Sequence, residues 1–524
     1  MMLSLTACTS DNKTVVDGQT TVTSNSAGGV AVFTPSDGIT LNQQTPLNKW
    51  AKLVPDLAKA LADAGFKKGD IDHTTSDSLA KQSRAIQDFV VDHLSNNTTD
   101  DSGIAIAPDN MTLLVAPVVE ADASTRQYGD YISQNLSTND ATDGEATSDG
   151  ESSEDDSSKD DSSNTESDST ASDEQAQAVD RLVSSLKLAK ESGMHVVLLG
   201  NSIEGYKPDA FVKFSDAQTI GKLQAEKMVS KLKLDKASKD NPKYIEVLLP
   251  YTAVDEKGNA NDSTFAQEAF RGIWQVLGSY YQKGVVESPS GTLDGKSTEN
   301  DWQAVAYDAA KEGSTAKVLD KRLTKTDGQS TLTRIDGIIT MNDYIASEVV
   351  KELDDLGYTG SAADINPQIT ISGIVGNITG KKDLSRDAVP DPIKSPENDN
   401  ANDSSSSDDD ADEDTSASDK DRDSQWPLVT GYGAYVSNIP SIVNGKQWMT
   451  GMEDRQTIAT DIAQACAKLN KDEALNSMPS IRNSEVGGVK KIPTISEPLL
   501  AVSASNLKSA LIDPGYISLA DAGL

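Results

Sequence analysis

Apolar residues along the chain form short continuous runs, each followed by a longer segment in which apolar positions recur three or four residues apart. The clearest example spans 332–356, where the run 335–340 leads through a turn at Asn342 and Asp343 into a helical pattern. This order predicts a buried strand followed by an amphipathic helix. Ligands of open parallel sheets bind beyond the carboxyl ends of the strands, so Asn342 and Asp343 are candidate binding residues.

The same pattern recurs along most of the chain. Strands are predicted at 30–33, 111–116, 195–199, 211–214, 244–249, 368–375, 427–430, 447–451 and 497–502, with a weaker one at 67–72. Helices are predicted at 46–64, 76–94, 175–192, 216–232, 264–283, 302–311, 436–444 and 454–469. Strands that alternate with helices predict an α/β fold with parallel sheets, and about ten to twelve strands suit two lobes better than one sheet.

Two acidic segments interrupt this pattern. Residues 137–172 and about 378–425 consist mainly of Ser, Asp, Glu, Thr and Asn. Such segments cannot bury enough apolar surface to offset their chain entropy, so both are predicted to be disordered insertions. They contribute much of the formal net charge of −35. That charge disfavours nucleic acid as a partner, because phosphates are bound by Lys and Arg.

The N-terminal segment contains a candidate lipidation site. Leu5-Thr6-Ala7-Cys8 fits the bacterial lipoprotein pattern, in which small residues precede a lipidated cysteine, and a polar tether follows to about Gly29. Only seven residues precede Cys8, without a basic or a long apolar segment, so either the signal is shortened or the match is by chance. The other cysteine, Cys466, lies in a predicted amphipathic helix and is expected to be a buried core residue.

Reactive residues form no recognisable constellation. The three histidines are scattered, and no Cys/His cluster has the spacing of a metal site. A Ser-His-Asp order, a Gly-rich phosphate loop and an apolar run long enough to span a membrane are all missing from the sequence. These observations favour a protein without enzymatic activity, cofactor or metal.

Four segments together resemble a known family. They are LLVAPVV, ESGMHVVLLGNS, IDGIITMNDYIAS and PLVTGYGAYVSNIPSIVNGKQWMT. Their order and spacing resemble the type I periplasmic-binding-protein family, specifically the sugar-type solute-binding proteins of ABC transporters. The similarity covers roughly 30–136, 175–375 and 427–510.

The resemblance implies two doubly wound parallel-sheet lobes joined by a three-strand hinge. It implies an N-terminal lobe of residues 30–214 plus 453–490 and a C-terminal lobe of residues 215–450 plus 491–524, after a signal and tether at 1–29.

The resemblance also implies a function. We expect a monomeric solute-binding lipoprotein on the extracytoplasmic face of a bacterial membrane, held there by a lipid on Cys8. It would capture a small ligand, a carbohydrate, by hinge closure and deliver it to an ABC permease. A subunit that reports the ligand to a membrane signalling protein, and a binder with a decayed or non-sugar site, stay open as alternatives. A ligand-binding domain of a transcription regulator is less consistent with the Leu5-Thr6-Ala7-Cys8 motif.

Residue by residue, the resemblance places the ligand among aromatic and amide side chains. Trp302 matches an aromatic residue that stacks on a sugar ring, and Asn342 matches the turn Asn that bonds sugar hydroxyls. Trp50 resembles the Trp after the first strand, with Thr34 and Ser36 in the same loop.

Other positions depart from the family pattern. The Asp-Arg pair that grips hydroxyls falls on Gly200 and Asn201, and the Asp of a second turn falls on Gly433, beside Tyr432. The Lys or Gln of the hinge falls on Glu453.

The Asn at the start of helix 264–283 falls on Thr264 or Phe265. A site of Trp50, Phe265, Trp302, Tyr432 and Asn342 would suit a larger, less polar or glycosylated ligand. Each of these aromatics could also be a core residue, and Asn342-Asp343 could serve only as a helix N-cap.

Overall fold

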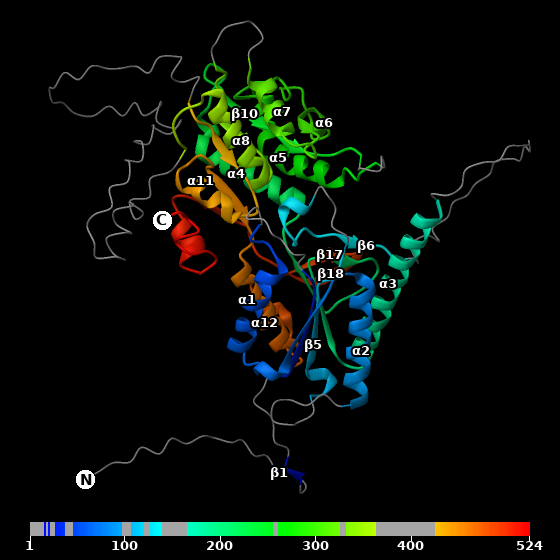
Figure 1. Cartoon of the computed structure of the whole chain (residues 1–524). Coiled ribbons are helices and arrows are strands. Elements are labelled where there is room, and N and C mark those ends of the chain that lie inside the picture. Colours follow the sequence, from blue (N-terminus) through cyan, green and yellow to red (C-terminus); the bar gives the residue numbers. More distant parts are fainter. Residues whose placement is uncertain are drawn as a thin grey trace, which may run out of the picture.

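Two parallel sheets organise the part of the chain that the computed structural model describes (Figure 1). The described residues are 15–16, 19–20, 27–36, 46–96, 106–119, 125–138, 165–254, 260–324, 332–362 and 425–524. Cys8, the predicted strand 368–375, nearly all of the second acidic segment and much of the first lie outside these residues.

The larger sheet has the strand order β17-β18-β9-β7-β5-β3-β4. Its strands are β3 (Gly29–Pro35), β4 (Ile71–Ser76), β5 (Met111–Val115), β7 (His195–Leu199), β9 (Ala210–Lys213), β17 (Ile481–Val486) and β18 (Val489–Ser496). Neighbouring strands are parallel, except that β17 and β18 form an antiparallel hairpin at one edge.

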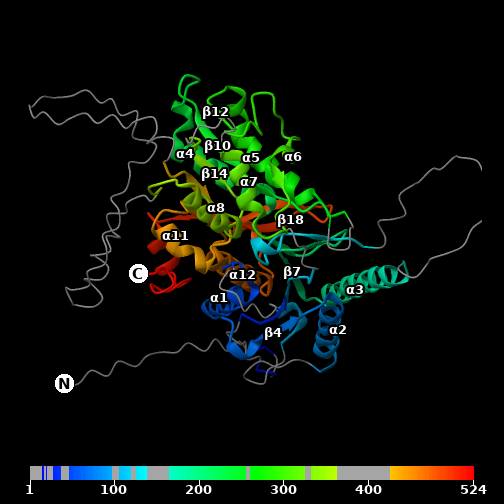
Figure 2. The same ribbon diagram turned by 45° about the horizontal axis from the view of Figure 1, so that its top comes forward.

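Helices cover both faces of the larger sheet (Figure 2). The helices α1 (Trp50–Asp63) and α12 (Arg455–Leu469) share one apolar cluster with Val30 and Val32 of β3. The helices α2 (Leu79–Asn96) and α3 (Thr165–Glu191) cover the other face. Successive side chains of a strand point to opposite faces, so a central strand covered on both sides must be apolar throughout.

The smaller sheet has the order β12-β10-β14-β15, with all pairs parallel. Its strands are β10 (Lys243–Val247), β12 (Val286–Glu287), β14 (Gly337–Ile339) and β15 (Leu428–Thr430). The helices packed with it are α4 (Ala217–Leu232), α5 (Thr264–Gln282), α7 (Ser314–Leu323) and α8 (Asp343–Leu356). A Cβ at Gly272 would lie 2.0 Å from the Gln218 carbonyl oxygen, so glycine allows α4 and α5 to approach closely.

Short elements complete the described chain. They are β1 (Val15–Val16), β2 (Gln19–Thr20), β6 (Asn135–Leu136), β8 (Ser202–Ile203), β11 (Leu249–Pro250), β13 (Ala306–Tyr307), β16 (Met449–Met452), β19 (Leu500–Ser503), α6 (Trp302–Val305) and α11 (Ile439–Val443). In each of the pairs β6–β8 and β11–β13 the strands are parallel, whereas β16 and β19 pair antiparallel.

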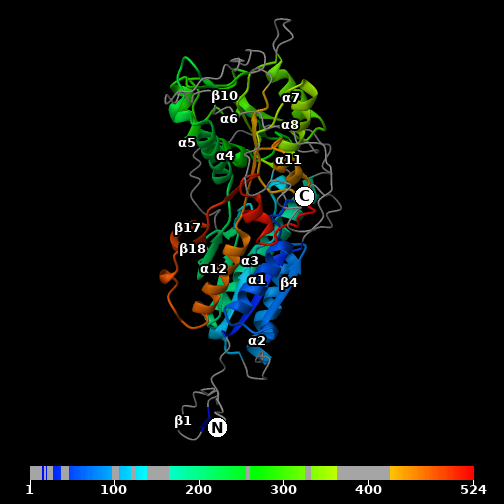
Figure 3. The ribbon, with the colours of Figure 1, turned by 90° about the vertical axis from the view of Figure 1, so that its left-hand side faces the viewer.

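The chain passes between the two lobes at three places, from β9 to α4, from β16 to α12 and from β18 to β19. The lobes lie one above the other (Figure 3). After the last crossing, C-terminal residues such as Leu507 and Leu511 pack with Ile439 and Ile442 of α11. The prediction of an α/β fold with two parallel-sheet lobes and a three-strand hinge is confirmed.

Several predicted boundaries differ from the structure. The hairpin β17–β18 was not predicted, and it places 491–496 in the larger sheet rather than in the C-terminal lobe. The helix predicted at 302–311 ends at Val305, because Ala306 and Tyr307 pair with β11. The strand predicted at 67–72 is β4, at 71–76. Helix α3 begins at Thr165, inside the segment predicted to be disordered, because extending a formed helix costs far less than starting one.

The buried Asn470, just after α12, ties that helix to the sheet. Its Oδ1 accepts a hydrogen bond from Thr112 Oγ1 at 2.6 Å, and its Nδ2 donates to the carbonyl oxygens of Ala27 at 3.0 Å and Gly29 at 3.1 Å. These bonds connect the end of α12 to the backbone at the start of β3 and to β5.

We expect Asn470→Leu to lower the free energy of unfolding by about 2–3 kcal/mol, because unpaired buried polar groups cost roughly that much. Chemical denaturation measures the change. The exposed Asn300, replaced in the same way, is the control and should change stability by less than about 0.5 kcal/mol. Equal losses in the two variants would contradict the structural role of Asn470.

Candidate ligand-binding site

Two turns at the carboxyl ends of β14 and β15 form the smaller lobe's side of the candidate site. Met341, which precedes Asn342, has φ 68°, and Ala434 has φ 49°. Left-handed backbone is uncommon for residues other than glycine, and such strained residues concentrate at functional sites. The two turns thus hold a costly conformation where parallel sheets place their ligands.

Asn342 acts both as a helix cap and as a contact to the larger lobe. Its Oδ1 accepts from the backbone N–H of Ile345 at 2.9 Å, which caps α8. Its Nδ2 donates to Oε1 of Gln127, at 3.1 Å. The cap fixes the direction in which the second half of the amide points, toward the larger lobe.

Asp343 is engaged inside the smaller lobe. Its carboxylate accepts from the backbone N–H of Tyr435 at 2.9 Å, from Thr450 Oγ1 at 2.9 Å and from Gln447 Nε2 at 2.7 Å. Complete burial raises the pKa of Asp343 to about 6, although these hydrogen bonds oppose the rise. Asp343 therefore fixes the turn that presents Tyr435.

Residues 125–132 of the larger lobe fill the space beside these turns (Figure 1, cyan). The Tyr128 ring is buried, with its centroid 4.6 Å from that of Phe265 and 6.2 Å from that of Tyr432. Tyr435 donates its hydroxyl hydrogen bond to the Gln127 carbonyl oxygen at 2.6 Å. The Tyr128 hydroxyl makes no hydrogen bond of normal geometry within the described residues, and its burial raises its pKa, which the nearby Asn342 amide opposes.

The same loop is held firmly to the larger lobe. Asp130 accepts from Lys49 Nζ at 2.6 Å and from the Trp50 backbone N–H at 3.1 Å. The Tyr131 hydroxyl donates to the Lys49 carbonyl oxygen at 2.5 Å, and its ring stacks on Phe214 at 4.6 Å.

A buried carboxyl joins two of the hinge crossings. Oε1 of Glu453 accepts from the Ser215 backbone N–H at 2.6 Å, and the Ser215 Oγ lies 2.5 Å from the Tyr432 hydroxyl. Burial raises the pKa of Glu453 to about 7, while hydrogen bonds from Ser215 and Tyr432 oppose the rise. The ionisation of this carboxyl is therefore linked to the stability of the hinge.

The structure brings some of the predicted site residues together. Asn342, Phe265 and Tyr432 surround Tyr128, with Asp343 and Glu453 buried behind them. Gln127, Tyr128 and Tyr435 were missed by the sequence analysis. The aromatic residues of the stretch RQYGDYI, in an otherwise polar region, are the signal that could have indicated the first two.

The other predicted residues lie elsewhere. Trp50 is 3% exposed and packs against Tyr131 and Phe214, as a core residue would. Thr34 Oγ1 bonds His73 Nε2 at 2.9 Å, and Ser36 is exposed.

Asn201 accepts from the Gln134 backbone N–H and donates to the Pro117 carbonyl oxygen, both at 2.9 Å, so it fixes loops of the larger lobe. The half-buried Trp302 meets Tyr251 edge-on at 5.1 Å.

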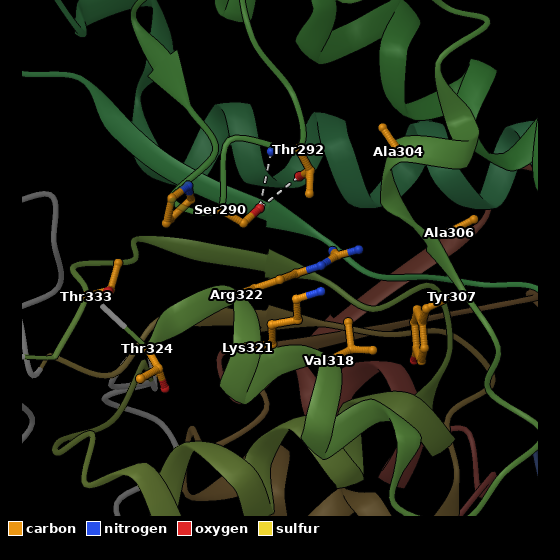
Figure 4. A pocket seen from close by; sticks show the side chains of 11 residues that line it. Ser290, Thr292, Ala304, Ala306, Tyr307, Val318, Lys321, Arg322, Thr324 and Thr333 are labelled. Carbon is orange, nitrogen blue, oxygen red and sulfur yellow. Dashed lines mark hydrogen bonds between the residues drawn. The ribbon is translucent and has the colours of Figure 1, made fainter. Parts of the chain in front are cut away.

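A cavity of about 790 Å³ lies in the smaller lobe, and none of the predicted site residues lines it (Figure 4). Arg322, on its wall, donates to Glu246 Oε1 at 3.1 Å and to the carbonyl oxygens of Val247 at 2.6 Å and Val305 at 3.1 Å. Glu246 also accepts from Ser290, at 2.8 Å. Arg322 and Glu246 therefore pair with each other and stabilise the lobe.

Among the described residues, no group of three or more His, Cys, Asp or Glu side chains is placed to hold a metal ion. Within the same residues, no helix is both long enough and apolar enough to cross a membrane.

The raised pKa of Glu453 predicts a pH-dependent gain in stability for Glu453→Gln. A carboxyl with an ordinary pKa of 4.5 and a folded pKa of about 7 makes the folded state lose stability as pH rises between these values. The amide keeps an acceptor for Ser215 and carries no charge. We expect the variant to match the wild type near pH 5 and to unfold at a higher temperature at pH 8, by about 2–4 °C for each kcal/mol recovered.

Differential scanning calorimetry at both pH values measures this difference. Glu287→Gln, at an exposed position, is the control and should show no pH-dependent difference from the wild type. A midpoint for Glu453→Gln that falls below the wild type at pH 8 would show that the carboxylate stabilises the hinge instead.

No family model matches this chain, and no curated protein does. Similar solved structures include an ABC transporter solute-binding protein from Clostridium phytofermentans with bound β-D-glucose, which is 17% identical with a TM-score of 0.45 over 94% of this chain and 99% of that one. Another is a carbohydrate transporter solute-binding protein from Chloroflexus aurantiacus in complex with D-glucose, 18% identical with a TM-score of 0.44 over 95% and 98% of the two chains.

A third is a periplasmic ribose ABC transporter protein from Conexibacter woesei, 13% identical with a TM-score of 0.43 over 93% and 96% of the two chains. Values this low do not assign a ligand to this chain.

Proposed function

We propose that this protein is an extracytoplasmic solute-binding protein that captures a small carbohydrate between its lobes by hinge closure and delivers it to an ABC permease. The observation that supports this most directly is the position of Asn342. It lies at the carboxyl end of a parallel strand, with its amide directed at the other lobe across the hinge.

The donors at this site suit a ligand rich in oxygen. Asn342 Nδ2 and the Tyr435 hydroxyl both donate to oxygen atoms of Gln127. Sugar hydroxyl and ring oxygens can accept such bonds, while Phe265 and Tyr432 offer aromatic surface to the apolar face of a sugar ring. A carbohydrate or a glycoside meets both requirements.

The finer assignments belong to the same proposal. The N-terminal lobe comprises 30–214 with the hinge-to-β18 segment 453–496, and the C-terminal lobe comprises 215–450 with the tail after β18. A lipid on Cys8 would hold the protein at the membrane. Trp302, Thr34, Ser36 and Asn201 remain candidates for contact in a state with separated lobes, whereas Trp50 is covered by Tyr131 and Phe214 of its own lobe.

The ligand test measures thermal unfolding of the full chain, carrying Cys8→Ser, against monosaccharides, oligosaccharides, glycosides and nucleosides. A ligand that binds the native state raises the unfolding midpoint by mass action, by about 2.7 kcal/mol of stability at a concentration of one hundred times Kd. We expect a shift with one carbohydrate class, and a smaller shift in Asn342→Ala, which loses a donor at the site.

Tyr280→Ala is the matched control, since Tyr280 lies on α5 with its hydroxyl bonded to Asp235 and should leave the ligand shift intact. No shift with any compound would reject carbohydrate capture. Co-purification with an ABC permease would support delivery, whereas co-purification with a membrane kinase would support the alternative, a ligand-sensing receptor subunit.

A further inference from the structure

The loop 125–132 occupies the site that the proposed function assigns to the ligand. We propose that Gln127 and Tyr128 form an internal plug, which takes the place of the ligand, holds the lobes together without it, and must leave before a ligand can bind. This inference rests on the proposed function for the ligand's identity, but the position of the plug is independent of it.

Apolar side chains of the loop 125–132 pack into the cores of both lobes. Tyr128 and Ile132 belong to the apolar cluster that forms the core of the smaller lobe. Tyr131, between them, belongs to the core of the larger lobe. A loop of the larger lobe thus inserts side chains into the smaller one, and the two lobes cannot separate unless these side chains are withdrawn.

The plug satisfies the donors that a ligand would use. The side-chain oxygen of Gln127 accepts from Asn342 at 3.1 Å, and its carbonyl oxygen accepts from Tyr435 at 2.6 Å. The Tyr128 ring meanwhile packs on Phe265. Gln127 therefore occupies two donors that the oxygen atoms of a sugar could use, and Tyr128 covers aromatic surface of Phe265 on which a sugar ring could pack.

The plug is anchored asymmetrically. The ion pair between Lys49 and Asp130, at 2.6 Å, and the bond from Tyr131 to the Lys49 carbonyl oxygen attach the loop to the larger lobe. The Asp130 backbone N–H also donates to the Asn48 carbonyl oxygen at 2.8 Å. These anchors lie on the larger-lobe side, so the contacts of Gln127, Tyr128 and Ile132 with the smaller lobe are the ones that break when the plug withdraws.

The plugged arrangement contains a built-in cost. The buried Tyr128 hydroxyl makes no hydrogen bond of normal geometry within the described residues, and a buried polar group that is incompletely paired destabilises the plugged state. A ligand that displaces the plug releases this hydroxyl to water and takes over both donors. The plug therefore competes with the ligand without closing the site permanently. Because only unplugged molecules bind, the apparent affinity is the intrinsic affinity multiplied by the unplugged fraction.

The first experiment tests the plug without any ligand. Spin labels at Ala58→Cys in α1 and Lys317→Cys in α7, both exposed positions, report the distance between the lobes in the full chain with Cys8→Ser. The remaining Cys466 is buried. We expect one narrow distance distribution in the parent protein, and a broader, longer one in Tyr128→Ala.

A second release variant avoids the cavity that Tyr128→Ala creates. The variant Gln127→Ala removes the hydrogen bond between the plug and Asn342, while the Tyr128 ring and both donors of the site, Asn342 and Tyr435, stay in place. The control is Tyr206→Ala, which truncates another buried tyrosine whose hydroxyl makes no hydrogen bond of normal geometry within the described residues, but in the core of the larger lobe. It should leave the distance unchanged. A parent-like distance in both release variants would overturn the plug.

The second experiment titrates the four proteins with the carbohydrate that gives the largest thermal shift. We expect both release variants to bind at least about tenfold more tightly than the parent, and Tyr206→Ala to bind like the parent. Equal or weaker binding by the release variants would overturn competition by the plug. If no carbohydrate binds any of the four, the proposed function fails, and the label distances alone decide whether the plug exists.

Discussion

The amide of Asn342 is part of a strand-end turn, a helix cap and a contact between the lobes. Its oxygen caps α8, and this bond turns its nitrogen toward the larger lobe, where it meets Gln127. The strained Met341 before it and the buried Asp343 after it fix the same turn. The helix cap thereby orients the amide nitrogen that contacts the larger lobe.

Much of the fold follows from the sequence because central parallel strands are buried on both faces. β3, β5 and β7 appear as continuous apolar runs for this reason, and their positions were predicted within a few residues. The hairpin β17–β18 escaped prediction because it lies at the sheet edge, where Arg482, Lys490 and Lys491 face solvent and Pro493 interrupts the pattern.

The candidate site was less predictable. The turn at Asn342 follows from local sequence, since an apolar run ends there and a helix begins. The burial of Tyr128 does not, because it depends on contacts with Phe265, Tyr432 and Tyr435, which lie more than one hundred residues away in the chain. No local sequence pattern distinguishes a tyrosine that fills a site from one that lines it. The position of Tyr128 in the site therefore follows from the tertiary structure and not from the sequence.

The pairing of β6 with β8 has a mechanical consequence. β6, at Asn135–Leu136, lies between the loop 125–132 and the acidic segment that follows in the chain. Its bonds to β8, together with the Asn201 side chain that receives the Gln134 N–H, clamp the backbone to the larger lobe at that point. A force applied along the chain from the acidic segment therefore meets these bonds before it reaches Tyr128.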